Sequence, residues 1–203
     1  MADKIFKRKI YNKMLAWKKD FAGKTALLIE GARRIGKSTI TEEFARNEYE
    51  NYLIIYFANA PRTVIDLFDD ISDLQYFFIS LQSLTGISLK PGKSVIIFDE
   101  VQFCPKARQA IKFLVKDGRF HYIETGSLIS IKKNIKEILI PSEEQRLNMY
   151  PFDFEEFLWA IGKEPTFGLI RYSYEHLKPL GDAVNREMMK LFRLYILVGG
   201  MPQ

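Results

Sequence analysis

Short apolar runs alternate along the chain with segments whose apolar residues recur at helical spacing. The runs are typical of buried strands and lie at residues 26–30, 51–59, 94–98, 120–124 and 146–150. Helical patterns follow them at residues 39–46, 61–86, 106–116 and 153–161. Strands that alternate with helices predict βαβ units. We therefore expect an α/β fold of three layers around a central, mostly parallel sheet.

The two ends of the chain carry helical patterns without strands. Residues 4–21 predict an amphipathic helix with a basic face, and residues 182–198 predict another that ends at two glycines. Residues 131–144 predict a loop or a hairpin, and residues 165–179 a loop. We expect an N-terminal helix packed on the core at 1–22, the core itself at 23–160, and a short helical appendage at 161–203. The appendage would begin a lid or a further domain that continues beyond Gln203.

The most specific motif follows the first predicted strand. Residues 31–38, GARRIGKS, match G-x-x-x-x-G-K-[ST] between a strand and a helix. Gly31 and Gly36 allow a tight turn whose backbone N–H groups face a phosphate, and the helix adds its positive end. Lys37 would place its charge between the β- and γ-phosphates, and the Ser38 hydroxyl is a ligand for Mg²⁺. The predicted nucleotide-binding residues are Gly31, Ala32, Arg33, Arg34, Ile35, Gly36, Lys37, Ser38 and Thr39.

Two carboxylates follow the strand at residues 94–98. Asp99 would emerge at the carboxyl end of this strand, where ligands of α/β proteins bind, and would hold Mg²⁺ together with Ser38. Glu100 is placed to orient or deprotonate an attacking water. An acidic turn is the plain alternative for an Asp-Glu pair alone, but the motif upstream favours the functional interpretation. The pair also favours a hydrolase over a P-loop kinase, which transfers phosphate to an acceptor other than water.

Small polar residues end two further strands. Thr125 and Ser127 are placed to sense the γ-phosphate through a hydrogen bond, although such residues also end strands as turn formers. Asn59 is placed to hold Glu100 in an inactive orientation, and an Asx turn is the equal alternative.

Composition narrows the class of protein only slightly. The chain has 203 residues, 47% of them hydrophobic, enough for one α/β domain with a small appendage. A net charge of +5 permits contact with nucleic acid without arguing for it, since polyphosphate binders are often mildly basic. The single cysteine, Cys104, indicates no disulfide framework, and no apolar stretch is long enough to span a membrane. We expect a cytoplasmic protein. No N-K-x-D motif is present, which disfavours a GTPase.

Five segments together resemble the archaeal and bacterial AAA-type P-loop ATPases of the AAA_14 group, which usually continue into a domain of the DUF4143 type. The segments are GARRIGKST, VIIFDEVQFCPKA, IETGSLIS, MYPFDFEEFL and YILVGGMP. The resemblance implies a P-loop NTPase fold of the ASCE/AAA kind, with the Thr125 strand between the P-loop strand and the Asp99 strand. It also implies the roles given above for Lys37, Ser38, Asp99, Glu100 and Thr125.

The resemblance adds one arginine to the predicted site. Relatives usually carry Gly-Arg shortly before the segment that matches MYPFDFEEFL, and this chain has Gln145-Arg146 there. Arg146 is thus a candidate for a sensing arginine or one that acts on a neighbouring subunit. An ion pair with Glu143 or Glu144 is the alternative.

The combined prediction is an ATPase that binds ATP or ADP with Mg²⁺ and couples hydrolysis to a conformational change. Its predicted catalytic residues are Glu100, Lys37, Thr125 and Arg146. We expect slow turnover alone, because a protein partner or a homo-oligomer would supply an arginine finger. The alternative is a non-catalytic, nucleotide-gated module that binds DNA or protein through the basic helix from Lys4 to Lys19 or through residues 131–140. Loss of binding on neutralising Lys7, Arg8 and Lys9 would locate that surface.

Overall fold

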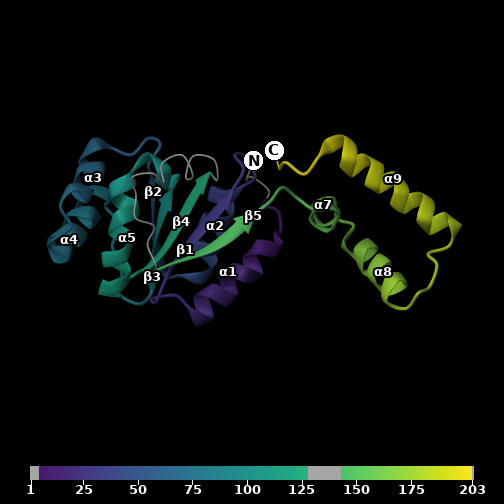
Figure 1. Ribbon diagram of the computed structural model, residues 1–203, viewed down its shortest axis with the longest axis horizontal. Coiled ribbons are helices and arrows are strands. Elements are labelled where there is room, and N and C mark those ends of the chain that lie inside the picture. Colours follow the sequence, from purple (N-terminus) through teal and green to yellow (C-terminus); the bar gives the residue numbers. More distant parts are fainter. Residues whose placement is uncertain (1–4, 128–142, 203) are drawn as a thin grey trace. The chain divides into compact units, whose positions relative to one another are not determined.

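The chain forms two compact units, of which a computed structural model describes residues 5–127 and 143–202 (Figure 1). The larger unit comprises residues 10–149, and the smaller unit comprises residues 1–9 and 150–203. The division thus falls after Lys9 and after Met149, whereas the sequence predicted boundaries at residues 22 and 160.

A five-stranded parallel sheet forms the centre of the larger unit, in the order β2-β3-β4-β1-β5. This confirms the predicted α/β fold with a parallel sheet, and it confirms that the Thr125 strand lies between the P-loop strand and the Asp99 strand. The strands are β1 (Ala26–Gly31), β2 (Asn51–Tyr56), β3 (Ser94–Asp99), β4 (His121–Ser127) and β5 (Glu144–Met149).

Helices cover both faces of this sheet and produce the three predicted layers. One apolar cluster joins α1 and α2 to the sheet through side chains such as Trp17, Phe44 and Ile97. The other joins α3, α4 and α5 to the opposite face through side chains such as Phe77, Ile96 and Leu114. The elements are α1 (Lys9–Asp20), α2 (Lys37–Glu48), α3 (Arg62–Asp66), α4 (Leu74–Thr85) and α5 (Pro105–Asp117), with short 3₁₀ turns η1 (Leu67–Asp69) and η2 (Val101–Phe103).

The smaller unit contains α7 (Phe154–Ala160), α8 (Glu164–Glu175) and α9 (Asp182–Val198). Asp153 caps α7 as predicted, and Glu156 completes the capping box. The loop predicted over residues 165–179 is wrong, because α8 spans most of it. Pro165 stands in the first turn of α8, where proline is tolerated, and the partly buried Phe167 packs against the apolar cluster of this unit.

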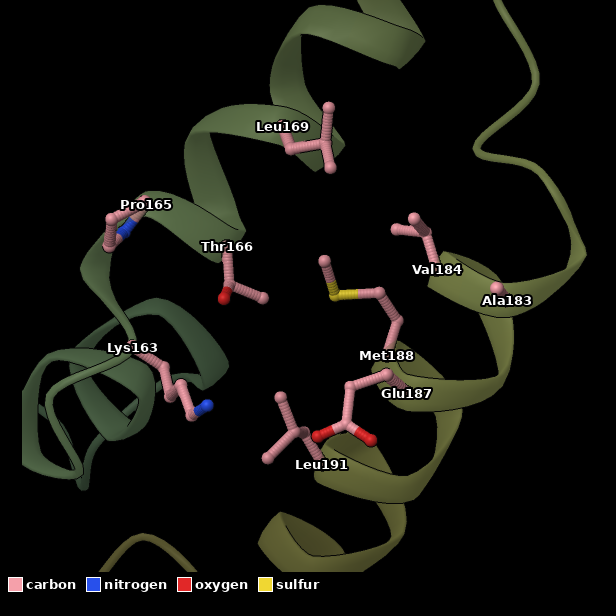
Figure 2. A pocket seen from close by; sticks show the side chains of 9 residues that line it. All are labelled: Lys163, Pro165, Thr166, Leu169, Ala183, Val184, Glu187, Met188 and Leu191. Atoms are coloured by element: carbon pink, nitrogen blue, oxygen red, sulfur yellow. The ribbon is translucent and has the colours of Figure 1, made fainter.

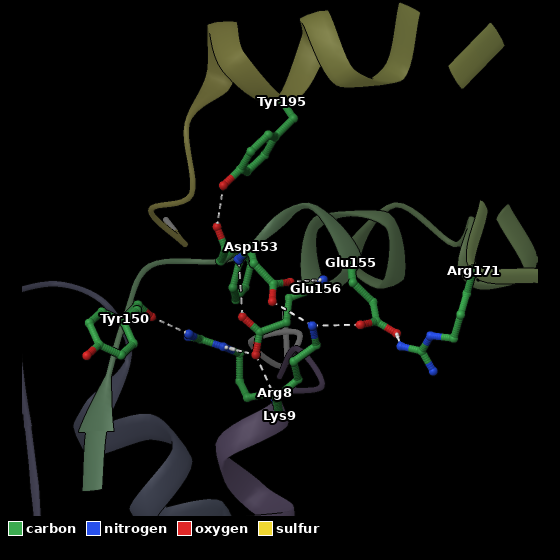
Figure 3. A network of polar contacts seen from close by, with 9 residues as sticks. Arg8, Lys9, Tyr150, Asp153, Glu155, Glu156, Arg171 and Tyr195 are labelled. Atoms are coloured by element: carbon green, nitrogen blue, oxygen red, sulfur yellow. Dashed lines mark hydrogen bonds and ion pairs between the residues drawn. The ribbon is translucent and has the colours of Figure 1, made fainter. Parts of the chain in front are cut away.

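Two basic residues at the start of α1, Arg8 and Lys9, are bound by residues of the smaller unit, and the helix begins only at Lys9 (Figure 3). Arg8 and Glu156, both 6% exposed, form an ion pair of 3.2 Å, and Arg8 also donates to the Tyr150 carbonyl at 2.6 Å. Lys9 pairs with Asp153, and its backbone N–H donates to Glu156. The predicted start of the first helix at residue 4 is therefore wrong. These contacts hold the segment in another conformation, and none of the sequence nearby signals them.

Two further sequence predictions concern the segment after β4 and membrane-spanning helices. Residues 128–142, which include most of the predicted loop or hairpin at 131–144, lie outside the described residues. In the part of the chain that is described, no helix has the length and apolar character needed to cross a bilayer.

Candidate functional site

The P-loop motif connects the end of β1 to the start of α2. Gly36 precedes α2 with φ 89°, a left-handed conformation that glycine adopts without strain, and Arg34 also has a positive φ of 62°. Gly31 has a different requirement. A Cβ at this position would collide with the backbone carbonyl of Met149 on β5 and with the side chain of Ile35. Gly31 is thus required for close packing rather than for the turn that the sequence suggested.

The side chains of the loop divide into buried and exposed groups. Ile35 is fully buried in the cluster beneath α1 and α2 and anchors the loop to the core. Ala32, Arg33, Arg34 and Thr39 are exposed. Exposure of these residues leaves the outer side of the loop open, as a backbone cradle for phosphate requires.

Lys37 is 4% exposed, and its ammonium donates to the carbonyls of Ala32 (2.8 Å) and Gly31 (3.4 Å). Burial lowers the pKa of Lys37, and the negative charges of Glu100 and Asp99 oppose that change. The carboxylates named in the sequence motif thus lie near the ammonium, and the arrangement brings a cation and two anions to one end of the sheet.

Asp99 connects the P-loop helix with β4. Its Oδ1 accepts hydrogen bonds from Ser38 Oγ at 2.7 Å and from Thr125 Oγ1 at 2.7 Å. Asp99 is 5% exposed and Thr125 is fully buried. Two hydroxyl donors on one carboxylate oxygen fix its position and direct it toward Ser38.

Thr125 also contacts Glu100. The backbone N–H of Glu100 donates to Thr125 Oγ1 at 3.0 Å, so this hydroxyl donates to one acidic residue and accepts from the next. Glu100 has φ 54°, a left-handed conformation that is uncommon for a residue with a side chain. The carboxylate of Glu100 accepts a hydrogen bond from the side-chain amide of Gln102.

Gln102 was not predicted as a site residue. The only indication in the sequence is its place two residues after Glu100 in the segment VIIFDEVQ. The predicted partner of Glu100, Asn59, is exposed, and within the described residues no hydrogen bond joins it to Glu100. The amide beside this carboxylate is thus that of Gln102.

Arg146 forms the ion pair that the sequence left as the alternative. Its Nε lies 2.8 Å from Glu144 Oε1, and a terminal nitrogen lies 4.0 Å from Glu30. The side chain is 39% exposed. A catalytic or sensing role for Arg146 stays a prediction.

A set of buried charges lies on the face of the sheet opposite Asp99. Glu124 on β4 is fully buried, and among the described residues its carboxylate oxygens have no hydrogen-bond partner. Arg108 on α5 lies 3.2 Å from Glu144, and both side chains are almost completely buried. Burial raises the pKa of Glu124, and the neighbouring charge of Glu144 raises it further. Nothing local in the sequence distinguishes these residues, because Arg108 and Glu144 are 36 positions apart and lie on different elements.

The oxygen donors of the site fit a magnesium ion. A hydroxyl and a carboxylate are hard ligands, and Mg²⁺ usually takes one or two protein oxygens, its other ligands being phosphate and water. Ser38 and Asp99 provide such a pair, already 2.7 Å apart. In the described part of the chain, no group of three or more His, Cys, Asp or Glu residues could form an all-protein metal cage.

A cavity of about 450 Å³ lies elsewhere, between α8 and α9 of the smaller unit (Figure 2). Its walls are mainly apolar and include Leu169, Met188 and Leu191. None of the P-loop or acidic residues discussed above lines it, so this cavity is separate from the phosphate chemistry.

The profile of the AAA_14 family, described as an AAA domain, matches residues 23–158. The chain belongs to the AAA_14 family. This confirms the family resemblance, and the matched region contains four of its five segments, YILVGGMP being outside it. The matched region includes the P-loop and the strand ends with Asp99 and Thr125. The AAA_14 domain is therefore a nucleotide-binding domain of the AAA type.

The fold of this AAA domain is also similar to a solved structure of Hsp104, determined in a closed state with ATPγS and FITC casein. The TM-score is 0.51 at 12% sequence identity, and the match covers 82% of this chain and 30% of the Hsp104 chain. At this identity the similarity supports the fold alone. Among curated protein sequences, none matches this chain.

Proposed function

We propose that this AAA domain binds ATP with Mg²⁺, hydrolyses it, and changes conformation with the state of the nucleotide. The observation that carries the proposal is the continuous set of hydrogen bonds from Ser38 through Asp99 and Thr125 to Glu100. If Asp99 and Glu100 only formed an acidic turn, nothing would require Asp99 to bond Ser38 at the end of the sheet where ligands of α/β proteins bind.

The residues of the loop bind the triphosphate. Backbone N–H groups around Gly36 and the first turn of α2 would hold the phosphate oxygens. Lys37 would exchange its hydrogen bonds to the Gly31 and Ala32 carbonyls for bonds to the β- and γ-phosphates. This exchange releases two backbone carbonyls of the loop, which gives the domain a nucleotide-dependent conformational change.

Glu100 serves as the base for an in-line attack by water. The water oxygen forms a bond to the γ-phosphorus, and the bond from phosphorus to the β,γ-bridging oxygen breaks. The electron pair of that bond leaves with ADP, and Glu100 accepts a proton of the water. Lys37 stabilises the negative charge that develops on the phosphate oxygens. Mg²⁺ held by Ser38 and Asp99 would supply further neutralisation of phosphate charge.

Ser38 and Asp99 would hold the ion, and Thr125 would keep Asp99 in place. In this proposal Thr125 acts through Asp99 and Glu100, because its hydroxyl already has a partner in each direction. Sensing of the γ-phosphate, the role expected from the sequence, would require Thr125 to give up its bond to Asp99.

Phosphate release from ATP and Mg²⁺, measured together with nucleotide binding, tests the proposal. Glu100→Gln should retain ATP affinity and lose about 10²- to 10⁴-fold in turnover, the range for loss of a general base. Lys37→Ala should lose binding. The matched control is Glu50→Gln, because Glu50 forms its ion pairs with Lys90 and Lys93 at the surface; this variant should behave as the unmodified protein.

Each result has a defined meaning. Normal turnover by Glu100→Gln would contradict the assignment of the base, and failure of the unmodified protein to bind ATP would contradict the proposal as a whole. Tight binding without turnover would favour the nucleotide-gated module or a site completed by an arginine from another subunit. Within the basic surface expected for that module, Arg8 is buried against Glu156, whereas Lys7 and Lys9 form exposed ion pairs with Glu164 and Asp153.

A further inference from the structure

Gln102 is the side chain that contacts the carboxylate of Glu100 from within its own loop. Its Nε2 donates to Glu100 Oε2, two residues earlier in the chain. An amide is a neutral donor that takes up no proton itself, so it can hold a carboxylate without competing for the proton that the carboxylate accepts.

The position of Gln102 is fixed by the packing on either side of it. Val101 is fully buried and Cys104 is 4% exposed, and both belong to the apolar cluster beneath α5. The N–H of Phe103 donates to the Glu100 carbonyl at 3.0 Å, which closes the short turn η2. Gln102 itself is 8% exposed. The amide thus stands on a rigid turn and not on a mobile loop.

Glu100 has the opposite character. Its backbone is held by the bond from its N–H to Thr125 Oγ1, but its side chain is only partly buried and has three rotatable bonds. Fixing such a side chain costs rotamer freedom. A base that must wait for a water in one orientation benefits when a neighbour has already restricted it.

We propose that Gln102 is the positioning residue of Glu100: it holds Oε2 and leaves Oε1 to accept the proton of the attacking water. This role rests on the proposed function, since it has meaning only if Glu100 is the base. Thr125 fixes the backbone of Glu100, and Gln102 fixes its side chain.

Kinetics of Gln102→Met in two backgrounds test the role. Methionine is close in size to glutamine and lacks the donor, so turnover should fall about 10- to 100-fold, with KM and the Kd for ATP within about twofold. Gln102→Asn keeps the amide on a shorter side chain and should retain more turnover than Gln102→Met. In a Glu100→Gln background, the residual rate should change less than twofold on adding Gln102→Met, because the base is already absent.

A second measurement uses the nucleotide-free protein. The side-chain amide signals of Gln102, assigned by their loss in Gln102→Met, should shift in ¹H–¹⁵N spectra when Glu100→Gln is introduced. They should not shift in the surface control Glu50→Gln. Signals that stay in place in Glu100→Gln would overturn the contact itself.

The kinetic outcomes distinguish the positioning role of Gln102 from the proposed hydrolysis of ATP. Unchanged or faster turnover in Gln102→Met, or an equal loss in both backgrounds, would overturn the positioning role while hydrolysis stands. No hydrolysis by the unmodified protein would overturn the proposed function, and the positioning role with it.

Discussion

The hydroxyl of Thr125 makes two hydrogen bonds, and Thr125→Val removes both while keeping the branched shape of the side chain. The bond lost to Asp99 involves a charged acceptor, for which about 1.5–3 kcal/mol is typical. The N–H of Glu100, which is only partly buried, then loses its acceptor at an added cost of about 1 kcal/mol. We expect Thr125→Val to lower the free energy of unfolding by about 3 kcal/mol.

Thr125→Ser is the matched control, since it keeps the hydroxyl and removes only a methyl group. It should cost about 1 kcal/mol through the small cavity that remains. Urea denaturation in a Trp159→Phe background measures the effect in the larger unit, because Trp17, 1% exposed, is then the remaining tryptophan. The affinity for ATP in the presence of Mg²⁺ should fall about tenfold in Thr125→Val, which corresponds to about 1.4 kcal/mol.

Two results would refute this reasoning. A valine variant within about 0.5 kcal/mol of the unmodified protein would mean that the hydroxyl contributes nothing measurable, as for an ordinary surface position. Equal destabilisation by valine and serine would assign the effect to the methyl group and not to the two hydrogen bonds.

Three further predictions concern the buried charges and the glycine of β1. Burial raises the pKa of Glu124 above 4.5, so its contribution to stability is complete below pH 4.5 and is lost as the pH rises through the folded-state pKa. Glu124→Gln should remove that part of the pH dependence, at most about 1.4 kcal/mol per pH unit in urea denaturation, and an unchanged slope would contradict it. Arg8→Met leaves Glu156 buried without its cation and should lower the free energy of unfolding, followed by circular dichroism, by about 3–5 kcal/mol. The double variant Arg8→Met, Glu156→Gln should lose less stability. An equal loss in both would argue against the ion pair. Gly31→Ala forces β5 from its place and should cost about 2 kcal/mol or more together with ATP affinity, whereas Gly168→Ala, with nothing near its Cβ, should be neutral or stabilising in the same assays.

Local sequence predicted most of the larger unit, and α9 of the smaller unit, because the signals there are local. The four apolar residues at 95–98 are followed directly by Asp99, and β3 ends at that residue. The helix predicted at residues 182–198 has the bounds of α9, because its apolar spacing is regular and two glycines follow it. The family resemblance placed the Thr125 strand between the P-loop strand and the Asp99 strand, and the sheet confirms that placement.

Other features depend on residues far apart in the sequence and could not be predicted from it. Arg8 and Glu156 are 148 positions apart. From the sequence alone, the basic residues around Arg8 resemble the solvated face of a helix, because nothing nearby indicates that Glu156 pairs with Arg8. Likewise, α8 has no buried residue, and the Pro165 and Gly168 within it are residue types that punctuate loops, so its segment resembled a loop.

The register of β4 explains why Thr125, which the sequence predicted as a phosphate sensor, lies beside Asp99. Phe98 on β3 pairs with Glu124 on β4, so the next residues along the two strands are neighbours too. Side chains alternate between the faces of a strand, and Ile97 and Ile123 belong to the cluster beneath α1 and α2. Asp99 and Thr125, two residues further on, therefore lie on that same face.

The helix that covers this face is α2, whose first turn carries Ser38, so the three oxygens meet there. Glu124 points to the opposite face by the same alternation, where α5 provides Arg108. A slip of β4 by one residue would bring Glu124 beside Asp99 and place two carboxylates in contact without a metal between them. The register that brings Thr125 to Asp99 is thus also the one that forces Glu124 into the core, and the two polar sets on β4 have one cause.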